Sequence, residues 1–217
     1  MDAIHALREA GTAVVSDVFD ELGRRPAVLH EGIRPLEGRV SFAGPAYTVA
    51  GHSEEFDGGD RTKLQAIDEM PAGCVAVWSG GDIRGVCCFG DLLATSMQAR
   101  GVAGVVVDGG VRDSAFLADL ELPIYARYRT PAQGLGRWRV TEVQEPVELA
   151  GAIEDRVRIE PGDIVVADDD GIVVIASELV DDVAERAAAW ASGEEEAREE
   201  IGRGLPLLTA LERYGHL

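Results

Sequence analysis

The chain of 217 residues has few cysteines, no clustered basic residues and no long apolar run. Its three cysteines form neither a CxxC pair nor an even set, which disfavours a disulfide framework. Neighbouring Cys87 and Cys88 lie in an apolar segment without a basic neighbour, so we expect buried, unreactive thiols. The glycine-rich stretches lack the GxGxxG spacing, so a dinucleotide site is poorly supported.

Basic residues are outnumbered, with 20 Lys and Arg against 39 Asp and Glu, and the formal net charge is −19. A surface of this sign repels phosphate backbones, so we expect no nucleic-acid partner. The longest apolar runs, such as 102–107 and 172–176, are too short to cross a bilayer. The first residues do not resemble a signal peptide, so we expect no membrane partner and a cytoplasmic location.

The pattern of short helical and strand-like segments favours one α/β domain over residues 1–217, because no internal repeat or low-complexity linker divides the chain. Periodicity and turn residues predict helices at 2–10 and 12–22 (broken at Gly11), 62–69, 91–100 (ending at Gly101), 114–120, 178–201 and 206–214. They predict strands at 39–51 (interrupted at Gly44–Pro45), 75–78, 86–89, 105–108 and 124–126, and a hairpin over 163–176 that turns at 169–171. The near-continuous apolar run at 105–108 indicates a sheet covered on both faces.

The stretch 90–113, GDLLATSMQARGVAGVVVDGGVRD, points most directly to chemistry. Gly90 precedes a helix start and lets a ligand approach the backbone amides of Asp91, Leu92 and Leu93. Such unpaired amides and the helix dipole favour a carboxylate or a phosphate. A plain strand-to-helix connection is the alternative interpretation of a lone glycine.

Arg112 and Asp113 come just after the buried strand, at the edge where α/β sheets usually place ligands. A surface ion pair or a helix cap is the alternative interpretation of this pair. Asp91 begins the preceding helix, so we expect both acids at the same edge of neighbouring strands. Two carboxylates, acting partly through waters, suit a hard cation such as Mg²⁺ or Mn²⁺, and Arg112 can bind a developing oxyanion.

On these residues the chain resembles the family that joins regulator of ribonuclease activity A (RraA) to the class II 4-hydroxy-4-methyl-2-oxoglutarate / 4-carboxy-4-hydroxy-2-oxoadipate aldolases. The similarity covers most of the chain and includes GPAYTV at 44–49, the stretch 90–113, and PGDIVVADDDGIVVI at 161–175. The resemblance implies a compact α/β/β sandwich of the RraA-like type with flanking helices. It also implies a homotrimer or homohexamer with active sites between subunits.

The resemblance assigns a role to each candidate site residue. Asp113 matches the ligand of the divalent metal, and Arg112 matches the residue that binds pyruvate's oxygen and stabilises the enolate. Asp91 matches a second acid that supports the metal's water shell, and the amides of 90–93 match those that bind the substrate carboxylate. Family members that act only as ribonuclease regulators tend to lack the acid after the arginine, whereas this chain keeps Asp113. It departs from some aldolases at Phe116, where a further acid can occur.

The implied function is that of a carbon–carbon lyase, a class II aldolase that depends on Mg²⁺ or Mn²⁺. Its substrates would be 4-hydroxy-2-oxo acids such as 4-hydroxy-4-methyl-2-oxoglutarate or 4-carboxy-4-hydroxy-2-oxoadipate, cleaved to pyruvate through a metal-stabilised enolate, with oxaloacetate decarboxylation as a side activity. In the aldolases an acid from a neighbouring subunit completes the site, and the acidic run at 194–200 can supply it here. The alternative is a non-catalytic protein of the RraA type that binds and inhibits a ribonuclease.

Overall fold

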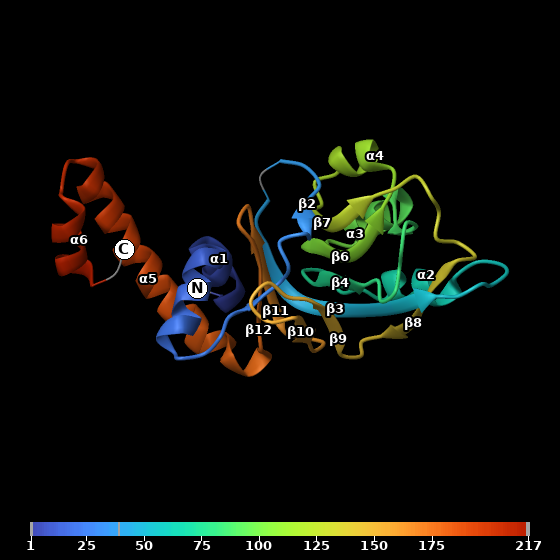
Figure 1. Cartoon of the computed structure of the whole chain (residues 1–217), viewed down its shortest axis with the longest axis horizontal. Helices are drawn as coiled ribbons and strands as arrows, with labels where there is room; N and C mark the ends of the chain where they lie inside the picture. Colours follow the sequence, from blue (N-terminus) through green and yellow to red (C-terminus); the bar gives the residue numbers. More distant parts are fainter. Residues whose placement is uncertain (1, 39, 216–217) are drawn as a thin grey trace.

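The computed structural model describes residues 2–38 and 40–215 (Figure 1). Its helices are α1 (Ala3–Glu21), α2 (Arg61–Asp68), α3 (Asp91–Ala99), α4 (Ser114–Ala118), α5 (Val180–Gly202), α6 (Leu207–Tyr214) and the 3₁₀ helix η1 (Ser177–Leu179). Its strands are β1 (Ala27–Val28), β2 (Arg34–Pro35), β3 (Phe42–Ser53), β4 (Val75–Ser79), β5 (Cys87–Phe89), β6 (Gly104–Val111), β7 (Ile124–Arg129), β8 (Trp138–Val143), β9 (Val147–Ala150), β10 (Arg156–Ile159), β11 (Ile164–Asp168) and β12 (Gly171–Ile175). Residue 39, the first of the strand expected at 39–51, lies outside the described residues.

The strands form a mixed sheet in the order β1-β12-β11-β3-β4-β6-β7-β2, with β5 paired to β6 and β8 to β3. Strands β3, β4, β6 and β7 run parallel to one another, and β5 runs parallel to β6. Strand β6 is buried at seven of its eight residues. Its near-continuous apolar sequence therefore predicted its place correctly, because a parallel strand inside such a sheet is covered on both faces.

Three hydrophobic clusters define the layers of the molecule. Helices α2, α3 and α4 pack on one face of the parallel strands. The opposite face is covered by β11 and β12, where the sheet curls round at β3, and by the separate two-stranded sheet of β9 and β10 (Figure 1). Helices α1 and α5 then pack on the outer side of β11 and β12. This arrangement confirms the α/β class, with a curled sheet and flanking helices, that the resemblance implied.

The interruption expected at Gly44–Pro45 is wrong, because β3 runs without a break through both residues. Pro45 lies where the strand changes partner: residues 42–45 pair with β11, and residues 46–50 pair with β4. A proline lacks an N–H and is tolerated in a strand where no donor is needed. Gly44 is required by close packing, since a Cβ atom there would lie 2.3 Å from the carbonyl oxygen of Gly73.

The expected break at Gly11 is confirmed, and it has a partner on β11. Gly11 has a φ of 85° inside α1, and the helix resumes at Thr12. The backbone N–H and the hydroxyl of Thr12 donate to the Asp168 carboxylate at 2.7 and 2.6 Å. Asp168 also begins the β11–β12 hairpin, where it pairs with Gly171 as the sequence predicted. One acid therefore starts the hairpin and caps the second half of α1.

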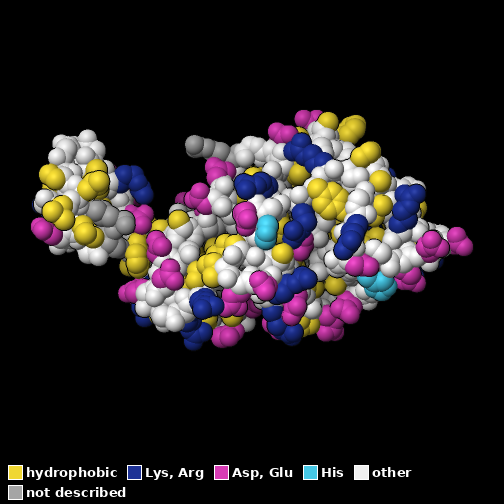
Figure 2. Space-filling model, viewed as in Figure 1, with side chains coloured by type: hydrophobic (Ala, Val, Ile, Leu, Met, Phe, Trp, Pro, Cys, Tyr) yellow, Lys and Arg dark blue, Asp and Glu magenta, His cyan; other side chains and the backbone are white. Residues whose placement is uncertain are grey.

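Helices α5 and α6 project beyond α1, away from α3 and α4 (Figure 1). The outer helix α6 exposes Leu207, Leu208 and Leu211, and apolar side chains gather at this end of the surface (Figure 2). Within residues 2–38 and 40–215, no helix combines the length and apolar content that crossing a membrane requires. Among the described residues, these three leucines form an exposed apolar stripe on α6, at the tip of the arm made by α5 and α6 (Figure 1).

We expect Asp168→Ala to lower the free energy of unfolding by about 1–3 kcal/mol, because it leaves two donors of Thr12 without their acceptor. Thr12→Val removes only the hydroxyl donor, so its loss should be smaller, and Thr12→Ser should be near neutral. Chemical denaturation at one protein concentration measures all three values. Equal losses for Asp168→Ala and Thr12→Val would contradict the two-bond cap.

Candidate active site

Strands β5 and β6 lie side by side and end at the same edge of the sheet. Cys87 pairs with Gly110 and Phe89 with Val111. The backbone N–H of Arg112 then donates to the carbonyl of Phe89 at 3.1 Å. Helix α3 begins directly after β5, and Arg112 and Asp113 come directly after β6. The start of the helix and the Arg–Asp pair are therefore brought together.

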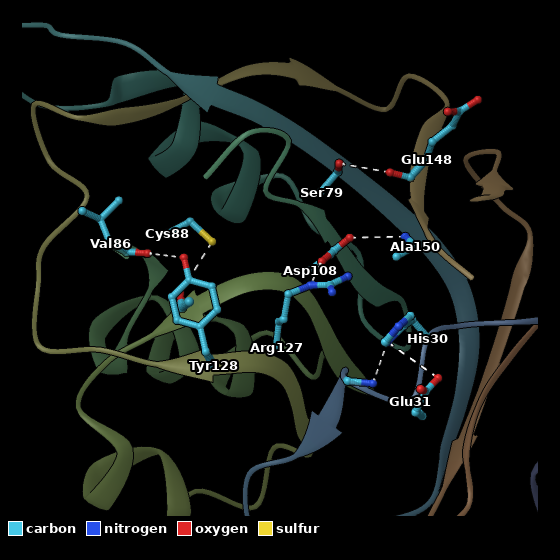
Figure 3. A network of polar contacts seen from close by, with 12 residues as sticks. His30, Glu31, Ser79, Val86, Cys88, Asp108, Arg127, Tyr128, Glu148 and Ala150 are labelled. Atoms are coloured by element: carbon cyan, nitrogen blue, oxygen red, sulfur yellow. Dashed lines mark hydrogen bonds and ion pairs between the residues drawn. The ribbon is translucent and has the colours of Figure 1, made fainter. Parts of the chain in front are cut away.

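Side-chain contacts behind this edge hold β5 in place (Figure 3). The hydroxyl of Tyr128 on β7 donates to the carbonyl of Val86 at 2.9 Å. The thiol of Cys88 donates to the carbonyl of Gly110 on β6 at 3.7 Å. Burial raises the pKa of the Cys88 thiol to about 12, so this group is a packed donor and no nucleophile.

Gly90 is the point of closest approach between the helix start and the Arg–Asp pair. A Cβ atom on Gly90 would lie 3.0 Å from Asp113 Oδ2 and 3.4 Å from Arg112 Cγ. Gly90 caps α3 without a side chain, so the first amides of this nine-residue helix have no intrahelical acceptor. Asp91 Oδ1 accepts a hydrogen bond from the N–H of Leu92 at 2.7 Å. One of the amides predicted to bind a ligand thus has an acceptor within its own helix.

Arg112 and Asp113 contact each other, with Nε 3.2 Å from Oδ2 and the side chains 41% and 34% exposed. Asp113 has a φ of 60°, a left-handed backbone that asparagine and aspartate adopt more readily than most residues. It precedes α4, and its carbonyl accepts from the N–H of Leu117. Its side chain makes no capping hydrogen bond. The structure therefore contains an ion pair between Arg112 and Asp113, whereas the Asp113 carboxylate does not cap α4.

A cavity of about 320 Å³ opens at this edge of the sheet. It is lined by every residue predicted for the site: Gly90, Asp91, Leu92, Leu93, Arg112 and Asp113. Lys63 of α2, Cys87 and Cys88 of β5, and the loop 133–135 also line it. Sequence reasoning missed Lys63 and this loop, because neither carries a motif and both reach the cavity only through the tertiary fold.

The oxygen donors here fit a hard divalent cation. Among the described residues, no three His, Cys, Asp or Glu side chains converge as a ligand group. Asp113 nevertheless presents a partly exposed carboxylate to the cavity, and Asp91 lines the same space. Mg²⁺ commonly uses one or two protein carboxylates and completes its octahedron with water and substrate oxygens. The residues present therefore suit a weakly liganded Mg²⁺ or Mn²⁺ and do not suit zinc.

The acidic run of α5 does not reach this cavity within one chain. Glu194, Glu199 and Glu200 form ion pairs with arginines of α5 and α6. Both helices lie at the far end of the molecule from α3 and α4 (Figure 1). Phe116, at the position where some aldolases have an acid, is 67% exposed on α4. Its hydrocarbon side chain provides no ligand for a metal.

Comparison with known proteins agrees with this arrangement. The sequence profile of the RraA-like family, described as Aldolase/RraA, matches residues 12–174. The chain belongs to the RraA-like family. Helices α5 and α6 lie beyond the matched range.

The similar proteins include one named for an aldolase activity and one described as a member of a ribonuclease-inhibitor family. Protein DlpA of Legionella pneumophila is 29% identical over 212 residues, which cover 97% of this chain but only 33% of DlpA. An Alkalilimnicola ehrlichii protein, named for a proposed 4-hydroxy-4-methyl-2-oxoglutarate aldolase activity, is 36% identical over 169 residues, which are 76% of this chain and 96% of that protein. The crystal structure of Streptomyces coelicolor RraAS2, described as an unusual member of the RNase ES inhibitor RraA family, superposes with a TM-score of 0.80 at 29% identity, over 92% of this chain and 98% of RraAS2.

We expect the thiols of Cys74 and Cys88 to label slowly with a thiol reagent at pH 8, because burial raises their pKa values to about 11 and about 12. Guanidinium should make both react at the rate of a free thiol, and mass spectrometry of the labelled peptides identifies the positions. Rapid labelling of Cys88 in the folded protein would contradict a closed contact between β5 and β6.

Proposed function

We propose that this RraA-like protein is a divalent-metal-dependent pyruvate aldolase acting on 4-hydroxy-2-oxo acids. The observation that carries the proposal is the shared cavity. A guanidinium, two carboxylates and the amino end of a helix all line one space of about 320 Å³. The aldolase names of relatives at similar length support the same reaction class.

The 2-oxo acid end of the substrate would bind at the start of α3. Its carboxylate would accept hydrogen bonds from amides of residues 90–93 other than that of Leu92, which already donates to Asp91 Oδ1, and the helix dipole makes this end attractive to an anion. Gly90 permits this approach because it has no side chain between the amides and Arg112. The 2-oxo oxygen then lies near the guanidinium of Arg112.

Cleavage breaks the C3–C4 bond after the C4 hydroxyl loses its proton. We assign that proton to Asp91, acting through a water molecule, and the position of Asp91 in the lining of the same cavity supports this. The C4 oxygen becomes the carbonyl oxygen of the departing fragment, while the electrons of the broken bond pass to C3 and the 2-oxo group as the enolate of pyruvate, whose negative charge Arg112 would stabilise. Asp113 would hold a divalent cation, which would supply Lewis acidity to the reaction when bound. Protonation of C3 releases pyruvate, and oxaloacetate decarboxylation would share this enolate.

Asp113→Asn tests the reaction, because asparagine tolerates the left-handed backbone at this position while losing the anionic ligand. We expect metal-dependent pyruvate release to fall by at least about 100-fold, as when a main electrostatic contact is removed. A lactate dehydrogenase assay with 4-hydroxy-4-methyl-2-oxoglutarate and with oxaloacetate measures it, with Mg²⁺, with Mn²⁺ and with chelator. Asp119→Asn, at the other end of α4, should retain activity.

Undiminished turnover by Asp113→Asn would refute the assignment of the site. The second candidate is an RraA-type inhibitor of a ribonuclease, which the likeness to RraAS2 favours. Inhibition of a purified ribonuclease by the wild-type protein, together with no pyruvate from either substrate, would establish that function instead.

We further propose a homotrimer or a pair of trimers in which the arm formed by α5 and α6 packs on a second copy of the chain. The exposed leucines of α6 support this, because Leu207, Leu208 and Leu211 are 64%, 69% and 44% exposed in one chain. Light scattering should give three or six times the mass of one chain. Leu208→Glu should shift it toward the mass of one chain, and a monomeric wild-type protein would contradict the proposal.

A further inference from the structure

Lys63 is a cation of the cavity that the proposed mechanism does not use. It lies in the first turn of α2 and lines the same space as Arg112 and Asp113. Its side chain is 12% exposed, and its Nζ lies 4.8 Å from the centre of the Trp138 ring. An ammonium over an indole face is attracted by the negative face of the ring, which favours a defined position.

The indole that orients Lys63 is itself fixed. Trp138 is fully buried, and its Nε1 donates to the carbonyl of Gly80 at 2.8 Å. It packs against β3 at Gly51, where a Cβ atom would come within 2.4 Å of the ring. The packing of Trp138 of β8 against β3 therefore fixes the ring on which the Lys63 ammonium lies.

Asp60 neutralises Lys63 only in part. Both oxygens of this buried carboxylate already accept backbone N–H groups, Oδ1 from Lys63 at 3.1 Å and Oδ2 from Val140 at 2.8 Å. The ammonium is 3.8 Å from Oδ2, too far for a good hydrogen bond. Burial lowers the pKa of Lys63, and the charge of Asp60 opposes that shift without cancelling it. A desolvated cation in this state gains from a further anion.

We propose that Lys63 binds the second carboxylate of the substrate and so makes the cavity selective for dicarboxylic 2-oxo acids. The proposal rests on the proposed function, in which the 2-oxo acid end occupies residues 90–93 and Arg112. Lys63 is then the remaining cation among the residues that line this cavity.

Arg129, which lines a neighbouring cavity, is a weaker candidate for the same role. Its guanidinium already donates to the carbonyl of Leu36 and lies 3.6 Å from the carboxylate of Glu37. Its side chain is also half exposed, so water screens its charge more than that of Lys63.

Two non-cleavable ligands of equal chain length test the proposal. 2-Oxoglutarate carries the distal carboxylate, 2-oxopentanoate lacks it, and neither has a C4 hydroxyl. Calorimetry in Mg²⁺ should show that the wild-type protein binds 2-oxoglutarate more tightly. Lys63→Met should weaken 2-oxoglutarate roughly tenfold to a hundredfold, the range for one hydrogen bond to a charged group, and leave 2-oxopentanoate unchanged.

Arg61→Met is the matched control, because it removes an exposed cation of α2 that does not line the cavity. It should leave both dissociation constants unchanged. Near-ultraviolet circular dichroism checks the packing of Trp138, and Lys63→Gln replaces Lys63→Met if the latter fails to fold.

Equal weakening of both ligands, no weakening of either, or a wild-type protein without preference for 2-oxoglutarate would each overturn the role of Lys63. Binding is measured without turnover. A wild-type protein that releases no pyruvate therefore rejects the proposed function separately from this comparison.

Discussion

The parallel pairing of β5 with β6 is the constraint on which the site depends. Because both strands end at one edge, the amino end of α3 and the Arg112–Asp113 pair lie side by side. The approach is closest at Gly90, where no side chain fits between helix and carboxylate without displacing one of them. A right-handed connection from strand through helix to a neighbouring parallel strand produces this proximity. The chemistry proposed for the cavity follows from that local unit.

Local pattern predicted the elements whose neighbours in space are also neighbours in sequence. The apolar run of β6, the glycine at the end of α3 and the turn of the β11–β12 hairpin all act within a few residues. The uninterrupted course of β3 was not predictable, because Pro45 is tolerated only where the strand passes from β11 to β4. Strands β8, β9 and β10 were not predicted either, because their short alternating segments lie among glycines and prolines.

The candidate site also has a part that local sequence predicts and a part that depends on distant packing. Residues 90–93 and 112–113 belong to one consecutive segment, so the sequence predicted that they would meet, and the structure brings them together. Lys63 reaches the cavity from α2 through its contact with Trp138 of β8. A lone lysine carries no local signal of such a contact, because packing across distant strands decides it. The role of each residue in catalysis stays a prediction.

The close packing of Trp138 against Gly51 of β3 has a consequence for changing which substrates the protein accepts. A Cβ atom at position 51 would lie 2.3 Å from the carbonyl oxygen of Arg139 and 2.4 Å from the indole, so a side chain there would displace the ring on which the ammonium of Lys63 lies. Under the role proposed for Lys63, substrate preference is open to alteration from β3, a strand with no residue among the described ones that line the cavity. Directed evolution of this scaffold should include that glycine among its randomised positions, although inspection of the wall alone would leave it out.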